Sequence, residues 1–224
     1  MQTVIAFGID IGATKTGITV FRLGKLEDEL IEAVTVEANV IPIKGTEAKR
    51  RKRLRSKGKE VKKKASLGEV SVINSDVSRC WDLVSGIREL IIKYSPRGIF
   101  VEMPSGGGQD ARAHRLMGGA TFMIATILAY EDISFEMFSP TDVEKSLGIF
   151  VTSKEVKERG LTSSQARSWK KYRMETVVKA FWPDFKAWPK TAELAEDAYD
   201  SAGAFICGVG ANNLYARLKE KLSG

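Results

Sequence analysis

Cysteine and histidine, the residues that most often bind zinc or build a disulfide framework, are scarce in this sequence. Its 224 residues include two cysteines and a single histidine. Cys80 and Cys207 lie far apart and match neither a zinc-binding spacing nor a disulfide framework. We therefore expect two reduced thiols, as in a cytosolic protein. One histidine on an apolar-bordered helix is more often structural than catalytic, so His114 is given no chemical role.

Long apolar runs are missing as well. No stretch reaches the roughly 20 apolar residues that a membrane-spanning helix needs. The first residues do not combine a basic start with an apolar core, as a secretory signal does. We therefore expect a cytoplasmic protein with no membrane partner.

Positive charge is abundant but confined to one tract. The segment from Lys44 to Ser66 contains twelve Lys or Arg and two Glu, a local charge of +10. Because the whole chain carries +7, the remaining residues sum to −3. We predict a single domain over residues 1–224, with a flexible basic insert at 44–66 and a helical C-terminal tail.

The hydrophobic pattern predicts an α/β protein. Apolar, β-branched runs indicate early strands at 4–9, 16–22 and 32–40. Helical spacing then alternates with two further strands, and helices close the chain. Helices are expected at 71–93, 111–130, 139–148, 174–182 and 191–207 with a tail to 222, strands at 98–102 and 133–138, and a polar, basic stretch at 153–173. This order predicts a mixed sheet flanked by helices.

Four carboxylates stand at positions where structure alone would not favour them. Asp10 follows the first apolar strand and Glu102 ends another, while Asp197 and Asp200 share one face of a helix rich in alanine. Taken singly, such residues are usually turn formers or members of a solvated face. Side by side, like carboxylates repel unless a cation joins them. Hard oxygen ligands suit Mg²⁺ or Mn²⁺, and two such ions can drive phosphodiester hydrolysis.

The order of these motifs resembles the RuvC family of Holliday-junction resolvases. The similar segments are Phe7–Gly12 through Thr16-Gly17, Val101-Glu102, the helix at 111–129 with Gly118-Gly119-Ala120, Ser139–Lys145, and Glu196–Ala202. The loop at 104–107 is similar to phage-type members. The resemblance implies an RNase H-like fold and a homodimer that makes paired nicks across a four-way DNA junction. It also implies that Asp10, Glu102, Asp197 and Asp200 are catalytic and ligate Mg²⁺, with Mn²⁺ as a substitute. The basic tract at 44–66 and the stretch at 151–168 depart from the compact bacterial members.

Several basic residues are candidates for DNA contact. The tract includes Arg50, Arg51, Lys52 and Arg53, and its charge density favours a DNA-binding arm over a solvated loop. The other candidates are Lys15 in the first motif, Arg112 at a helix start, and the pair Lys170 and Lys171. For Arg112 and the lysine pair, a plain exposed surface is an equal alternative.

Two other functions stay open. Residues 8–17 also resemble the first phosphate motif of ROK-type sugar kinases, but no second phosphate motif follows. A branched-DNA-binding protein without chemistry is the other alternative, although unused buried acids would be costly.

Overall fold

The computed structural model describes residues 3–12, 14–38, 72–103 and 111–222, with the backbone alone for 72–74 and 111–117. The predicted basic insert and the DNA-contact candidates Arg50 to Arg53 lie outside these residues. So does the side chain of Arg112. In the described part of the chain, no helix is long and apolar enough to span a membrane.

A five-stranded mixed sheet forms the centre of the fold, in the order β3-β2-β1-β4-β5. Its strands are β1 Val4–Ile11, β2 Lys15–Leu23, β3 Glu29–Glu37, β4 Gly98–Glu102 and β5 Ser134–Phe138. The first three pair as an antiparallel meander, and β4 and β5 join β1 in parallel. The predicted mixed α/β sheet is confirmed.

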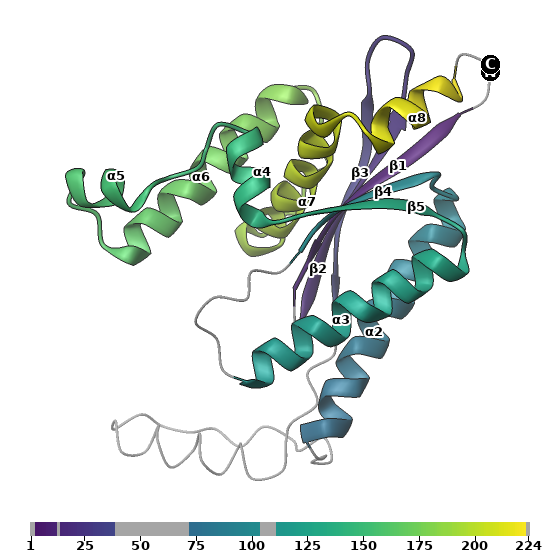
Figure 1. Cartoon of the computed structure of the whole chain (residues 1–224), viewed down its shortest axis with the longest axis horizontal. Coiled ribbons are helices and arrows are strands. Elements are labelled where there is room, and N and C mark those ends of the chain that lie inside the picture. Colours follow the sequence, from purple (N-terminus) through teal and green to yellow (C-terminus); the bar gives the residue numbers. More distant parts are fainter. Residues whose placement is uncertain (1–2, 13, 39–71, 104–110, 223–224) are drawn as a thin grey trace.

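Helices cover both faces of this sheet (Figure 1). On one face lie α2 Val72–Tyr94 and α3 Ala111–Tyr130, which pack on Phe7, Ile9 and Ile99. On the other face lies α7 Ala192–Ala211, which contacts every strand and also packs against α4 and α6. The bounds of the remaining helices are α4 Pro140–Ser146, α5 Ser153–Glu158, α6 Ser163–Phe181 and α8 Leu214–Glu220.

Side-chain alternation along β1 assigns each residue to a face. Phe7, Ile9 and Ile11 join the core under α2 and α3, whereas Val4 and Ala6 join the core under α7. Because successive strand residues point to opposite faces, Asp10 falls on the α7 face. The same alternation in β4, where Phe100 packs against Phe205 of α7, puts Glu102 on that face as well.

Three element boundaries differ from the sequence prediction. The first strand continues to Ile11, so Asp10 lies within the strand rather than after it. The third strand begins at Glu29 instead of residue 32. The polar, basic stretch at 153–173, for which no helix was predicted, is helical in α5 and in α6, which begins at Ser163 instead of Met174.

Hydrogen-bonded caps explain the two helices in the polar stretch. Thr152 and Glu155 form a capping box before α5, and Thr162 and Gln165 form one before α6. In each, the threonine hydroxyl accepts from a backbone N–H while the partner side chain accepts from the threonine N–H. The polar residues therefore start helices here, although they lack an apolar stripe.

Candidate active site

The predicted acids of β1 and β4 are neighbours across the centre of the sheet. Asp10 and Glu102 are partners in the parallel register of the two strands. Both lie on the face that α7 covers, at the carboxyl end of their strands. In the strand order β3-β2-β1-β4-β5, β1 and β4 are adjacent inner strands, and this adjacency brings the two acids side by side.

Helix α7 brings the other two acids to the same place because its backbone lies almost on the sheet. A Cβ on Gly8 of β1 would be 2.1 Å from the carbonyl oxygen of Ser201, so only glycine fits there. Ala198, Ala202 and Ala204 of α7 are fully buried, as their small size predicted. The helix positions Asp197 and Asp200, one turn apart, over Asp10.

The electrostatics of the four carboxyls show how close they are. Burial raises the pKa of Asp10 to about 7, with repulsion from Asp197 and Glu196 adding to the shift. Burial raises the pKa of Glu102 to about 9, and the charges of Asp10 and Asp200 contribute. Each carboxyl thus resists ionisation partly because the others are near.

Burial is also the largest effect for the acids of α7, but the acids that raise the pKa of Asp197 are Glu196 and Glu193. Burial raises the pKa of Asp197 to about 6, against an opposing effect from Lys15. Burial also raises the pKa of Asp200 well above its ordinary value, with Asp10 the largest charge contribution. A bound cation would relieve this strain, and oxygen-only ligands fit Mg²⁺ or Mn²⁺.

Among the four candidate acids, one carboxylate oxygen is buried without a hydrogen-bond partner in the described part of the chain. Oδ2 of Asp197 is buried and accepts no hydrogen bond. Such an oxygen is costly unless a ligand pairs with it. As the side chains lie, no three described carboxylates converge into a ready metal-binding group, so ligation would require side-chain rotation.

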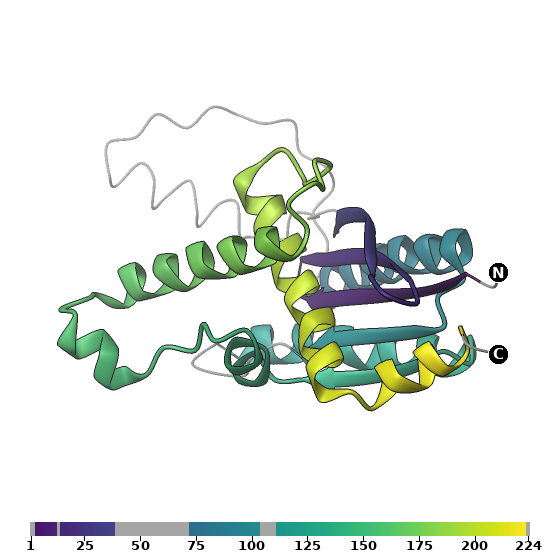
Figure 2. The ribbon, with the colours of Figure 1, turned by 90° about the horizontal axis from the view of Figure 1, so that it is seen from above.

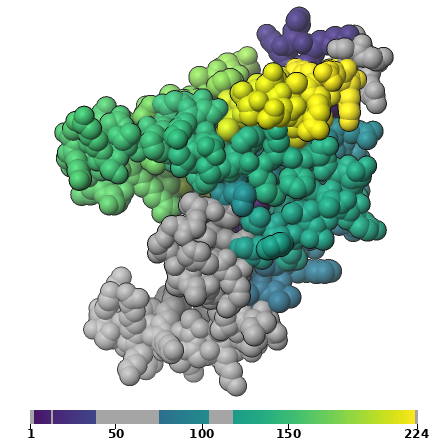
Figure 3. All heavy atoms as spheres, in the orientation of Figure 1, coloured from purple at the N-terminus to yellow at the C-terminus, as the bar shows by residue number. Residues whose placement is uncertain are grey.

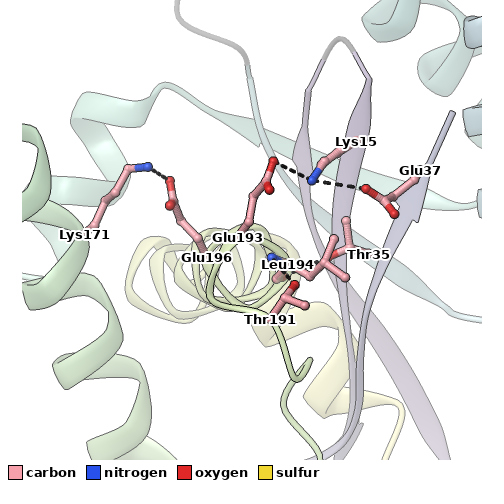
Figure 4. A network of polar contacts seen from close by, with 8 residues as sticks. All are labelled: Lys15, Thr35, Glu37, Lys171, Thr191, Glu193, Leu194 and Glu196. Atoms are coloured by element: carbon pink, nitrogen blue, oxygen red, sulfur yellow. Dashed lines mark hydrogen bonds and ion pairs between the residues drawn. The ribbon is translucent and has the colours of Figure 1, made fainter. Parts of the chain in front are cut away.

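Lysines and additional acids form ion pairs beside these carboxyls (Figure 4). Lys15 Nζ lies 2.7 Å from Glu193 and 3.1 Å from Glu37, and so joins α7 to β2 and β3. Lys171 of α6 pairs with Glu196, the residue before Asp197. Thr35 Oγ1 also donates to the carbonyl oxygen of Leu194 at 2.9 Å. These contacts fix the first turns of α7 against the sheet edge and so help to position Asp197.

Lys170, the last described DNA-contact candidate, is bound to an acid as well. Its Nζ donates to both carboxylate oxygens of Glu144 in α4, each at 2.9 Å. The sequence predicted that Lys170 and Lys171 precede a helix at 174–182. The structure instead places both lysines inside α6. The structure thus brings Lys15, Lys170 and Lys171 to the rim of the carboxylate group, each with an acidic partner.

Two acids near the site were given no role from the sequence. Glu144 raises the pKa of Glu102, and Glu196 raises those of Asp10 and Asp200, in each case after the larger effect of burial. Glu196 could have been noticed because it directly precedes Asp197. Nothing in the sequence relates Glu144 to Glu102, since their proximity arises only when α4 follows β5 across the sheet.

The strand order and the face that the acids share define an RNase H-like fold. Among solved structures, Thermus thermophilus RuvC aligns with a TM-score of 0.55 at 14% identity, over 93% of this chain and 97% of that one. The same protein in complex with a Holliday junction substrate gives 0.55 at 13% identity, over 93% and 96%. The yeast mitochondrial Holliday junction resolvase aligns at 0.49 and 13% identity, over 97% and 83%. No protein-family model and no curated protein matches the sequence. The chain therefore has the fold of RuvC, as its motifs predicted.

Proposed function

We propose that this chain is a metal-dependent endonuclease that cuts branched DNA, with the four-way junction as its substrate. The observation that carries the proposal is the register pairing of Asp10 with Glu102 beneath Asp197 and Asp200. A group of partly buried acids with raised pKa values is expensive to maintain in a protein without a cation to bind. The RuvC structure that contains a Holliday junction supports the choice of substrate.

Asp10, Glu102, Asp197 and Asp200 are the residues that would hold Mg²⁺, with Mn²⁺ as a substitute. Bound ions of this kind supply Lewis-acid activation of water and stabilise the leaving oxygen of the phosphodiester. The described chain contributes the positions of the four carboxylates, which the sheet register and the close packing of α7 fix. Ile9 and Val101, which precede Asp10 and Glu102, are fully buried on the opposite face of the sheet and anchor the two strands in the core.

Lys15 and Lys171 are proposed to contact the phosphates of the strand being cut. Both cations lie next to α7 and lower the pKa of Asp197, so both are close to the carboxylate group. In the DNA-free chain their charges are balanced by Glu193 and Glu196. A phosphate could replace these acidic partners without leaving the lysines unpaired. The basic tract at 44–66 is proposed as a further DNA-binding segment on its charge alone.

A homodimer would allow the paired nicks that resolution of a junction requires. Large apolar side chains are exposed on the helices of one face, among them Trp81 on α2 at 67% and Phe122 on α3 at 78%. We propose these helices as the dimer face, since burial of such residues is favourable. Sedimentation should give a dimer for the wild type and a monomer for Trp81→Ser; a wild-type monomer at all concentrations would contradict the proposal.

Cleavage of a labelled four-way junction tests the function directly. With Mg²⁺, the wild type should nick the junction and leave a linear duplex of the same arm sequence intact. Asp10→Asn should bind the junction without cutting it, since it removes a proposed metal ligand and no phosphate contact. Junction binding without cleavage by the wild type, in Mg²⁺ or Mn²⁺, would favour the non-catalytic alternative. Equal cutting of both DNAs would contradict the choice of substrate.

A further inference from the structure

Helices α5 and α6 form an arm that extends away from the sheet. We define the arm as residues 151–173. Figures 1 and 2 show α5 and the first half of α6 projecting beyond the body of the molecule, and Figure 3 shows the same region as a protrusion at the left. Helix α5 buries no residue, and the part of α6 within the arm buries only Ala166. The arm therefore adds little to the hydrophobic core.

Charge is the property that the arm concentrates. It contains seven Lys or Arg and two Glu, a net charge of +5, whereas the chain outside the 44–66 tract sums to −3. Lys154, Lys157, Arg159 and Arg167 are all exposed. An extension with few core contacts and this charge has the electrostatic character of a polyanion-binding surface.

Aromatic rings hold several of these cations in place. The guanidinium of Arg159 lies 4.4 Å from the ring centre of Trp169, and that of Arg173 lies 5.2 Å from it. Arg173 also donates to the carbonyl oxygen of Gly148 at 2.5 Å. Cation–π contacts of this kind restrict long flexible side chains and leave their charges available to a ligand.

The cations continue from the arm to the carboxylate site. The Nζ atom of Lys170 lies 5.9 Å from the ring centre of Phe150, and that of Lys145 in α4 lies 5.5 Å from the same ring centre. Lys170 is in turn bound to Glu144, which influences the pKa of Glu102. Basic side chains thus occur from the rim of the site along α6 to the tip of the arm, and the two nearest the site, Lys170 and Lys171, are paired with acids.

We infer that the α5–α6 arm binds the phosphate backbone of a duplex DNA arm that leaves the catalytic site. The inference rests on the proposed function, because it takes nucleic acid as the ligand. Phosphates fit this surface better than unpaired bases do, since the ring of Trp169 already carries two guanidiniums and is less open to base stacking. The contact would position duplex DNA without reading its sequence.

The test compares two double variants that lose the same charge at different places. Lys157→Gln with Arg167→Gln removes two exposed positive charges from the arm and lowers its net charge from +5 to +3. Lys25→Gln with Arg217→Gln is the control, because these exposed residues follow β2 and lie in α8, far from α5 in Figure 1. Affinity for a fluorescent linear duplex and for a four-way junction is measured in EDTA over a series of salt concentrations, so that no DNA is cut. Circular dichroism of all proteins confirms that the helices remain folded.

In the arm variant, the slope of log affinity against log salt should become shallower. Each lost phosphate contact lowers the slope by about 0.9, so the loss of two contacts lowers it by up to about 1.8. The change should appear with both DNAs, while the control variant keeps the wild-type slope. Trp169→Leu should weaken duplex binding in the same direction, because Arg159 and Arg173 lose their support. Equal slopes for the arm and control variants would overturn the inference, as would a wild type that binds no duplex.

These results separate the inference from the proposed function. If the arm variant has a shallower salt slope but the wild type cuts no junction, the arm is a DNA-binding surface and the proposed nuclease function is contradicted. If the wild type cuts the junction but the arm variant keeps the wild-type slope, the proposed nuclease function stands and the inference about the arm is contradicted.

Discussion

Asp10 of β1 lies directly opposite Gly17 of β2 in the antiparallel register of these strands. The position beside the candidate catalytic acid therefore carries no side chain. The backbone of α7 takes up that space, since a Cβ on Gly17 would be 1.9 Å from the carbonyl oxygen of Asp197. Gly17, together with Gly8, thus sets the distance between the acids of the sheet and those of the helix.

Gly17→Ala should damage both stability and cleavage. The added methyl group meets backbone rather than a flexible side chain, so α7 must move away from β2. Overpacking of this kind costs about 1–3 kcal/mol of unfolding free energy, and Asp197 would shift from Asp10. Urea unfolding and junction nicking measure the two effects. Gly118→Ala is the matched control, because a Cβ there meets nothing within 4 Å and alanine favours a helix. Wild-type stability and cleavage in Gly17→Ala would show that α7 is not held by this contact.

The acids along α7 should differ sharply in their importance. Asp197 has a buried carboxylate oxygen without a partner, whereas Glu193, one turn earlier, pairs with Lys15 and has a 78% exposed side chain. Asp197→Asn should lower the cleavage rate by about 100-fold or more, as expected when a metal contact worth several kcal/mol is lost. Glu193→Gln should cut within a few-fold of the wild type. Single-turnover rates at saturating protein provide the comparison, and similar losses in both variants would count against a metal role for Asp197.

The metal-free protein should become less stable as the pH rises. The folded chain holds the pKa of Asp10 at about 7 and that of Glu102 at about 9, above their ordinary values of 3.8 and 4.5. The folded state therefore retains protons that the unfolded chain releases, and the stability they provide is lost as the pH passes through the folded pKa values. Unfolding free energies in EDTA should fall from about pH 5.5 to pH 9, a range in which ordinary surface carboxylates stay ionised.

Glu102→Gln tests the cause of that pH dependence, since it removes the group with the higher of the two pKa values. Its unfolding free energy should fall less steeply over the same range. At pH 8, saturating Mg²⁺ should raise the melting temperature of the wild type more than that of the variant, because binding to the folded state alone stabilises it. Parallel pH profiles for the two proteins would show that Glu102 titrates normally.

Asp28 should matter for stability but not for cleavage. Its carboxylate accepts from Tyr215 Oη at 2.7 Å and from Lys219 Nζ at 2.6 Å, and so ties the turn between β2 and β3 to α8. Asp28→Asn weakens two charge-assisted hydrogen bonds and should lower the unfolding free energy by about 1.5–3 kcal/mol. Asp184 is an exposed acid that lines the same pocket as Asp28, and Asp184→Asn should change the unfolding free energy by less than about 0.5 kcal/mol. Unfolding curves and nicking rates of both variants decide the matter, and a loss of cleavage in folded Asp28→Asn would contradict its purely structural role.

The sequence was sufficient for the class of fold and for the identity of the candidate acids. Short apolar runs before Asp10 and up to Glu102 predicted two buried strands, and the three-residue spacing of Asp197 and Asp200 predicted a shared helix face. These features are local, because they depend on the repeat of a strand or a helix. The polar capping boxes before α5 and α6 were equally local, but the apolar periodicity used to find helices does not detect them.

The tertiary structure alone decided which residues meet. The pairing of Asp10 with Glu102 depends on the register of β1 with β4, whose residues are separated by some 90 positions in the chain. The approach of α7 depends on Gly17 facing a helix that comes much later, and the ion pairs of Lys15, Lys170 and Lys171 depend on how the helices pack. Local periodicity specifies the face on which a side chain lies, but contacts between distant segments follow from long-range packing and register, which no repeat in the sequence encodes.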